Sequence, residues 1–362
     1  MIVLLFAAGL VLLIVGAESL VRGASRLAAA AGLSPLVIGL TVVAFGTSAP
    51  ELAVSVSSSW NGQAGLALSN VVGSNIFNVL FILGLTGLIA PLAVTIEVIR
   101  RDVPVMIALS GVVLLLSLDG ALGRIEGLVL LAALVAYVVW CVRTSRAEAR
   151  ALPVEAVGVE SRTNARDWFT NLAFVAAGLA ALVVGAGWLV DGAVVFARAM
   201  GVGETVVGLT IVAAGTSLPE VATSVVAAVR GQRDIAVGNV VGSNVFNLLG
   251  VVGASAVAAP RGLEVGESVR HFDLPFMVAT AVVCLPFFVT GRRLARGEAA
   301  TFLVFYVLYL VALVLRSTGA GILSERSWTF LAFALPLSLV TIAGLSWWGT
   351  GPARARIGGR NH

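Results

Sequence analysis

One polar segment of this sequence occurs twice, and the spacing of its copies constrains the fold more than any other feature. Residues 39–51 read GLTVVAFGTSAPE, and residues 208–220 read GLTIVAAGTSLPE. Downstream, NVVGSNIFN at 70–78 returns as NVVGSNVFN at 239–247, again 169 residues later. From Gly39 to Gly84, 26 of 46 positions are identical to their counterparts. The chain is therefore built from two related halves, and each half places carboxylate, hydroxyl and amide groups inside an apolar stretch.

The apolar stretches predict a membrane protein. Hydrophobic residues make up 59% of the 362 residues and charged residues only 12%, with a mean hydropathy of +1.03. Apolar runs of about 20 residues are typical of transmembrane helices. The first run corresponds to an internal segment of the second half, so we expect a retained helix and not a cleaved signal peptide. The predicted spans are 2–24, 34–60, 64–90, 103–118, 124–143, 168–198, 204–229, 234–259, 272–290, 299–317 and 327–348.

Five spans per half is an odd number, so the second half enters the membrane upside down relative to the first. Such inverted repeats are typical of secondary transporters, which bind their substrate near the bilayer midplane between the repeats. We predict an all-α integral membrane fold with a ten-helix core of two inverted five-helix repeats and one extra C-terminal transmembrane helix. The predicted units are the first repeat at 1–143, a cytoplasmic linker at 144–167, the second repeat at 168–317, and the extra helix with a basic tail at 318–362.

Arginine predicts the orientation of the chain. All 23 basic residues are Arg. The loops and linker of one side hold 14 of them and the tail adds three, against six on the other side. Because cytoplasmic loops are enriched in basic residues, we expect the N-terminus outside and the C-terminus inside. The same distribution over short loops argues against nucleic-acid binding, which needs a continuous basic surface.

Two glutamates carry the strongest functional signal. Glu51 and Glu220 lie deep inside predicted spans, where an unpaired carboxylate costs several kcal/mol. Glu is too short to reach the interface from there, and no Arg lies within either repeat core to pair with it. We therefore expect both side chains to bind a cation.

The residues before each glutamate predict a broken helix. Thr47-Ser48 and Thr216-Ser217 are flanked by Gly and Pro, which interrupt helices and free backbone carbonyls to line a cavity. Hydrogen bonding between helices is an alternative role for a single Thr-Ser pair. The presence of both copies favours an ion site.

The second motif predicts one polar stripe on a helix in each half, because its polar residues recur every four positions. Ser and Asn oxygens suit hard cations, and the neighbouring glycines allow close helix packing. We expect ligation from Ser74, Ser243, Asn78 and Asn247, and a structural role for Asn70, Asn75, Asn239 and Asn244.

Other polar or reactive residues in the spans have simpler explanations. Glu18 and Asp191 fit interfacial charges better than linings of ion vestibules. Cys141 and Cys284 fit small core residues. His271 and His362 lie outside the spans, so no nucleophile and base are available for an intramembrane hydrolase, and we predict that the chain is not an enzyme.

The charge of the site constrains the transport mechanism. Two glutamates carry a charge of −2, which one Ca²⁺ or two Na⁺ neutralise, and a further Na⁺ would make each cycle electrogenic. An empty, occluded site of this charge would be very unfavourable in low dielectric. We therefore expect obligatory exchange, which argues against a uniporter or a channel.

These motifs resemble the α-repeats of the cation/Ca²⁺ exchanger superfamily, specifically prokaryotic Na⁺/Ca²⁺ exchangers, which carry GTSxPE followed by GSNxFN or GSNxFD. The resemblance implies that Ca²⁺ binds Glu51, Glu220 and the carbonyls of Thr47 and Thr216. It implies Na⁺ ligands in the glutamates, Ser48, Ser217, Ser74, Ser243 and the carbonyls of Ala44 and Ala213, with Asn78 and Asn247 at the centre.

The resemblance further implies an antiporter in the inner (cytoplasmic) membrane of a prokaryote. Its substrates would be Ca²⁺ and Na⁺, and its surroundings the lipid bilayer, with no resident cofactor and no obligate protein partner. Many relatives carry Asp where this chain has Asn247, and Asp there accompanies K⁺ co-transport, so we expect K⁺ independence. A Ca²⁺/H⁺ antiporter of the same fold is the alternative, although a proton needs no cage of Ser, Thr and Asn oxygens.

Overall fold

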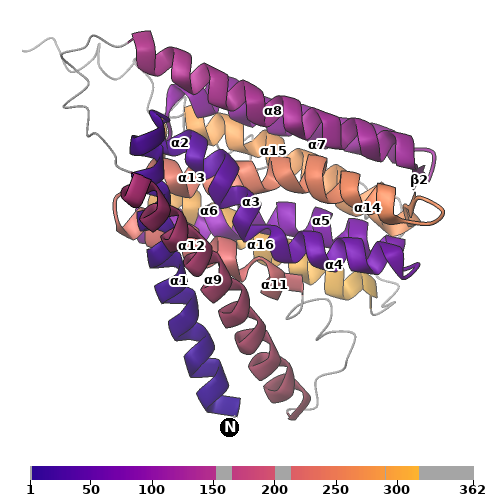
Figure 1. Ribbon diagram of the computed structural model, residues 1–362. Coiled ribbons are helices and arrows are strands. Elements are labelled where there is room, and N and C mark those ends of the chain that lie inside the picture. The colour runs from indigo at the N-terminus through magenta and orange to yellow at the C-terminus, as the bar shows by residue number, and fades with distance from the viewer. Residues whose placement is uncertain (1, 152–164, 200–212, 290, 318–362) are drawn as a thin grey trace, which may run out of the picture.

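Helices make up nearly all of the computed structural model, which describes residues 2–151, 165–199, 213–289 and 291–317 (Figure 1). The predicted eleventh span and basic tail lie outside these residues, as do the middle of the predicted linker and the start of the seventh span. The first half contains α1 (Ile2–Ala31), α2 (Pro35–Ile38), α3 (Ala44–Thr47), α4 (Ala49–Trp60), α5 (Ala64–Phe77), α6 (Leu83–Ile89), α7 (Val103–Leu116) and α8 (Arg124–Ala151). The second half contains α9 (Ala165–Ala199), α11 (Ala213–Thr216), α12 (Leu218–Val229), α13 (Arg233–Phe246), α14 (Val252–Ala258), α15 (Leu274–Val289) and α16 (Arg296–Ser317).

Wider π-helical turns join several of these helices into longer spans. They are η1 (Gly39–Val43), η2 (Asn78–Ile82), η3 (Val98–Asp102), η5 (Asn247–Val251) and η6 (Val269–Asp273). Two of them begin at the asparagines that end the repeated motif, Asn78 and Asn247. Turns of this kind are frequent at functional sites.

The spans confirm the prediction of an all-α membrane fold. Within the described residues, seven helices are long and apolar enough to cross a membrane, or eight when the bent pair Pro35–Thr47 and Ala49–Trp60 counts as one. Where the structure describes them, the ten predicted core spans are helical over most of their length. The main differences are at helix ends, because α1 continues to Ala31, α8 continues to Ala151 and α9 begins at Ala165.

Central and peripheral helices differ in what surrounds them. The span Arg233–Ala258 is wholly buried among other helices, although it is as apolar as a membrane span. By contrast, α8 exposes Leu128 and Val135, and α16 exposes Val304 and Val311. Apolar side chains on the outer helices are suited to lipid, so the helices that carry the repeated asparagines form the centre of the bundle.

Glycines bring α1 and α9 into close antiparallel contact. A Cβ atom on Gly16 would lie 2.9 Å from the carbonyl oxygen of Gly178, and one on Gly9 would lie 2.8 Å from that of Gly185. Gly9 and Gly178 are repeat counterparts, as are Gly16 and Gly185. Small residues at such a crossing let the two backbones approach within the membrane. The two helices run side by side away from the rest of the bundle in Figure 1.

Two short antiparallel strand pairs, which the sequence patterns did not predict, join the loops of the two halves. Strand β1 (Leu92–Ala93) pairs with β4 (Arg293–Leu294), and β2 (Ala121–Leu122) pairs with β3 (Leu263–Glu264). In the first pair, the loop after the third span of the first half meets the loop after the fourth span of the second half. In the second pair, the loop after the fourth span of the first half meets the loop after the third span of the second half. This crossed pairing is expected when the second half is inverted, since equivalent loops then lie on opposite sides.

Candidate functional site

Both copies of the Gly-Thr-Ser-x-Pro-Glu motif interrupt a helix, as predicted. Helix α3 ends at Thr47 and α4 begins at Ala49, and the segments Pro35–Thr47 and Ala49–Trp60 meet at a bend of 46°. Ser48 has φ −81° and ψ 8°, and Ser217 between α11 and α12 has φ −90° and ψ 7°. Pro50 has no N–H group and so cannot donate to the carbonyl one turn earlier. The same local sequence therefore produces the same break in each half.

The two glutamates that follow the breaks are fully buried, and each is held by the opposite repeat. The Ser217 hydroxyl donates a 2.7 Å hydrogen bond to Oε1 of Glu51. The Ser48 hydroxyl donates a 2.9 Å hydrogen bond to Oε1 of Glu220. The two bonds are repeat counterparts. This part of the site therefore has pseudo-twofold symmetry, with the axis between the two carboxylates.

A second crossed pair of hydrogen bonds joins η2 to α13 and η5 to α5. The side-chain amide of Asn78 donates to Oδ1 of Asn244 at 3.0 Å, and that of Asn247 donates to Oδ1 of Asn75 at 3.1 Å. All four asparagines are buried. The amide nitrogens of Asn78 and Asn247 thus point across the axis, and their own carbonyl oxygens are left for another partner.

Four oxygens on these glutamates and asparagines are among the buried side-chain atoms that have no hydrogen-bond partner in the described part of the chain. They are Oε2 of Glu51, Oε2 of Glu220, Oδ1 of Asn78 and Oδ1 of Asn247. Nearly all buried polar atoms in folded proteins have a partner, and unpartnered ones therefore require an explanation. Two carboxylate and two amide oxygens, contributed equally by the two repeats, are ligands that a hard cation prefers. Bound cations would supply partners for oxygens of this kind.

The remaining predicted ligands lie around this centre. The hydroxyl oxygens of Ser74 and Ser217 lie 3.3 Å apart, and the Ser243 hydroxyl is buried without a partner among the described residues. Thr47 donates to Oδ1 of Asn239 at 3.1 Å, and the Ala44 carbonyl accepts from the Ser48 backbone N–H at 3.0 Å. Thr216 and Ala213 end and begin α11, and the side chain of Ala213 lies outside the described residues.

The asparagines expected to be structural do hold other site residues in place. Asn239 donates to the hydroxyl of Ser224 at 3.0 Å and to the Glu220 carbonyl at 3.4 Å. Its counterpart Asn70 donates to Ser55 at 3.0 Å. These bonds tie each glutamate-bearing helix to the asparagine-bearing helix of its own repeat.

Two methionines that sequence reasoning missed complete the packing. The amide of Asn244 lies 3.3 Å from Sδ of Met106, and that of Asn75 lies 3.7 Å from Sδ of Met277. Each methionine comes four residues after an aspartate, Asp102 or Asp273. This shared spacing was a signal that could have identified the two methionines as counterparts.

Glu18 and Asp191 lie outside the site. Glu18 forms ion pairs with Arg22 and Arg230, and Asp191 is exposed on α9. Cys141 and Cys284 are buried and free, as expected for small core residues.

Comparison with known proteins places this arrangement among transporters. Residues 1–143 and 170–315 match a family model described as sodium/calcium exchanger protein. The chain is 36% identical to the putative antiporter CaxA of Alkalimonas amylolytica over 307 residues, which cover 83% of this chain and 95% of the relative. It is 33% identical to the sodium/calcium exchanger MaX1 of Methanosarcina acetivorans over 343 residues, covering 86% and 97%. The solved structure of the sodium-calcium exchanger NCX_Mj soaked with Na⁺ and Ca²⁺ matches with a TM-score of 0.74 and 29% identity, covering 86% of this chain and 98% of that chain.

Proposed function

Because this chain belongs to the sodium/calcium exchanger protein family, we propose that it exchanges Na⁺ for Ca²⁺ across a membrane by alternating access. The observation that carries the proposal is the set of four unpartnered buried oxygens on Glu51, Glu220, Asn78 and Asn247. Oxygen ligands of this kind fit both ions. The sodium/calcium exchangers among the similar proteins support the choice of substrates.

Calcium binds between the two glutamates in this proposal. One Ca²⁺ neutralises their combined charge of −2, and the carbonyls of Thr47 and Thr216 complete its coordination. Sodium ions share the glutamates and add the hydroxyls of Ser48, Ser217, Ser74 and Ser243, with the carbonyls of Ala44 and Ala213. Interrupted helices also line the ion sites of other transporters.

Sodium is the proposed coupling ion because of the hydroxyls that surround the carboxylates. Ser217 contacts both Glu51 and Ser74, so one hydroxyl lies between two further oxygens. A proton would need only a carboxylate. Ca²⁺/H⁺ antiport on the same fold remains the second candidate, since the putative antiporter CaxA is also similar to this chain.

Obligatory exchange follows from the cost of an empty site. With neither ion bound, two carboxylates would share a buried space away from water, which is unfavourable by several kcal/mol. The carrier therefore changes sides when loaded. More than two Na⁺ per Ca²⁺ would make the cycle electrogenic. Residue 247 is an amide and not a carboxylate, so the site has no additional negative charge to balance a co-transported K⁺.

Proteoliposomes provide the test. Ca²⁺ uptake is measured under an outward Na⁺ gradient with pH and K⁺ clamped, and again under a pH gradient without Na⁺. The proposal expects uptake that follows Na⁺, ignores K⁺ and responds to membrane potential. Uptake that ignores Na⁺ and follows the pH gradient would instead establish the proton-coupled alternative. Impermeant labelling of single cysteines near each terminus tests the proposed orientation in the inner membrane, with the N-terminus outside.

A further inference from the structure

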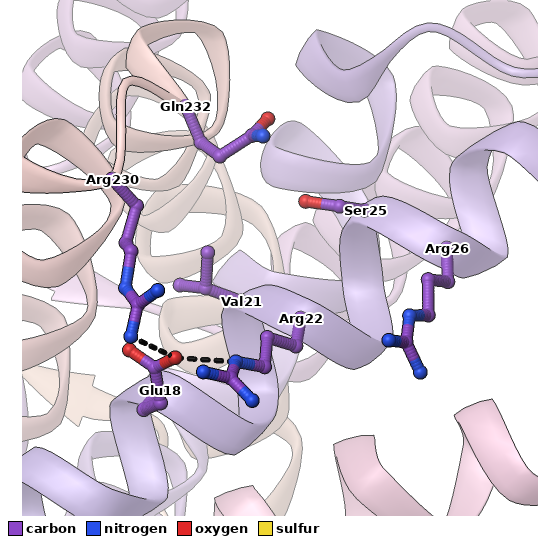
Figure 2. Close-up of a pocket in the computed structure, with 7 residues that line it drawn as sticks. All are labelled: Glu18, Val21, Arg22, Ser25, Arg26, Arg230 and Gln232. Atoms are coloured by element: carbon purple, nitrogen blue, oxygen red, sulfur yellow. Dashed lines mark ion pairs between the residues drawn. The ribbon is translucent and has the colours of Figure 1, made fainter.

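Glu18 joins two helices on the side of the molecule where α8 ends and α9 begins, which we term the linker side. Figure 2 shows its carboxylate between the guanidinium of Arg22, one turn further along α1, and that of Arg230. Arg230 is the C-cap residue of α12, the helix that carries Glu220 in its first turn. The Glu18–Arg230 ion pair therefore connects α1 directly to a helix of the ion site.

The pocket around this ion pair is positively charged overall. It contains one glutamate and three arginines, so it repels Na⁺ and Ca²⁺ and does not resemble the lining of a cation vestibule. Arg22 and Arg230 both form ion pairs with the Glu18 carboxylate. The residues that line the pocket are Glu18, Val21, Arg22, Ser25, Arg26, Arg230 and Gln232 (Figure 2).

Among the residues that the structure describes, the ion pair has no repeat counterpart on the opposite side of the molecule. The offset of 169 residues relates Glu18 to Gly187 and Arg230 to Asn61, neither of which carries a charge. Among the described residues, helix α1 packs along α12, whereas the corresponding helices α9 and α4 make at most marginal contact. A Cβ atom on Gly187 would have no neighbour within 4 Å. The two sides are therefore different in this structure, although the repeats are alike.

In a transporter with inverted repeats, the difference between the two sides distinguishes the two facing states. In such transporters the opposite-facing state is reached largely by moving one structural unit against the other about a fixed site. Exchanging the environments of the two repeats would place α9 against α4 and separate α1 from α12. The Glu18–Arg230 ion pair would then be lost, and no equivalent pair would replace it. A contact made in only one of two states shifts the equilibrium toward that state.

We propose that Glu18 and Arg230 are positioning residues that form a one-sided latch, which holds α1 against α12 and favours the state closed on the linker side. The latch rests on the proposed function in one respect, because it assumes that exchange requires two facing states. The pair is partly exposed, with side chains 24% and 51% accessible. Ion pairs of this exposure are weak, and we expect a shift of about two- to five-fold in the ratio of the two states.

A reversible crosslink tests whether α1 and α12 must separate during transport. In a background with Cys141→Ala and Cys284→Ala, the Glu18→Cys/Arg230→Cys variant is treated with a short bifunctional methanethiosulfonate reagent. We expect Ca²⁺ exchange to fall at least tenfold and to recover on reduction. The matched control is Glu18→Cys/Arg22→Cys, whose crosslink lies within α1 and should leave exchange unchanged. Full exchange by the crosslinked α1–α12 variant would overturn the latch.

A second measurement does not depend on which ions are transported, so failure of the latch is distinguishable from failure of the proposed function. Spin labels on exposed positions of α1 and α13, Ala29→Cys and Arg233→Cys, report the distance between these helices by pulsed EPR. We expect Glu18→Gln to increase the more open population two- to five-fold. Arg22→Gln should leave it unchanged, because Arg22 and Glu18 belong to the same helix. Equal effects of the two variants, or no effect of Glu18→Gln, would contradict the latch.

The mirror image of the latch can also be installed. Gly187→Glu together with Asn61→Arg would place an equivalent ion pair on the opposite side, and Gly187 has open space for the new side chain. We expect the double variant to shift the EPR distance distribution in the same direction as Glu18→Gln, away from the observed state. A shift toward the observed state would argue against the role of repeat exchange in this proposal.

Discussion

Ser217 donates a hydrogen bond of 2.7 Å to Glu51, although 166 residues separate them in the sequence. The counterpart bond from Ser48 to Glu220 makes the relationship reciprocal. Each carboxylate is thus oriented by the broken helix of the opposite repeat. Neither half of the site is complete without the other.

Removing the hydroxyl of Ser217 or that of Ser48 should weaken sodium binding to a similar extent. Ser217→Ala and Ser48→Ala each delete a hydrogen bond to a carboxylate, worth about 1.5–3 kcal/mol, and a proposed Na⁺ ligand. We expect both variants to raise the half-saturating Na⁺ concentration for Ca²⁺ exchange by about tenfold or more. The control is Ser69→Ala, because this exposed hydroxyl contacts only the Gly65 carbonyl among the described residues. A large effect at Ser217 with none at Ser48 would contradict a symmetric site.

A carboxylate at position 247 should change the ion requirement. Asn247→Asp raises the charge of the site to −3 and removes the amide that donates to Asn75. We expect slow exchange in Na⁺ alone and recovery when a further monovalent cation, K⁺ or H⁺, is supplied. The measurement is Ca²⁺ uptake by proteoliposomes as a function of K⁺ and pH. Rates that stay at the parental level without an added cation would show that the charge at this position does not govern coupling.

Packing between α1 and α9 should be sensitive to glycine at the crossing. A Cβ on Gly178 would lie 2.6 Å from the Leu20 backbone nitrogen, so Gly178→Val forces the helices apart. We expect a loss of about 1–3 kcal/mol of stability from overpacking, seen as a lower melting temperature in detergent. Gly187→Val on the same helix is the control, because its Cβ meets open space. Equal melting temperatures for the two variants would refute the close contact.

Much of the fold could be predicted because the membrane restricts the chain to helices of known length. The helix breaks at Ser48 and Ser217 were also predictable, since Gly and Pro act locally. The two-residue strand pairs were not, because they are too short to leave a pattern. They depend on which loops the inverted halves bring together.

The candidate site also combines features that act locally with features that depend on how distant helices meet. Duplication pointed to Glu51 and Glu220, and the four-residue spacing pointed to Asn78 and Asn247. The sequence could not indicate that Asn78 bonds to Asn244, because this bond depends on how two distant helices cross. The role proposed for Glu18 was harder still to predict from the sequence. Its counterpart Gly187 is uncharged, so duplication provided no signal.

The central claim is that both glutamates belong to one shared site, and Ca²⁺ binding stoichiometry tests it most directly. Isothermal titration of the purified protein in Na⁺-free buffer gives the number of Ca²⁺ bound per chain, for the parent and for Glu51→Gln and Glu220→Gln. Ser57→Ala, on the exposed face of the same helix, serves as the control for substitution within α4. A shared site predicts one Ca²⁺ per parental chain and loss of measurable binding in either glutamine variant. Two Ca²⁺ per parental chain, with one retained in each variant, would contradict the account.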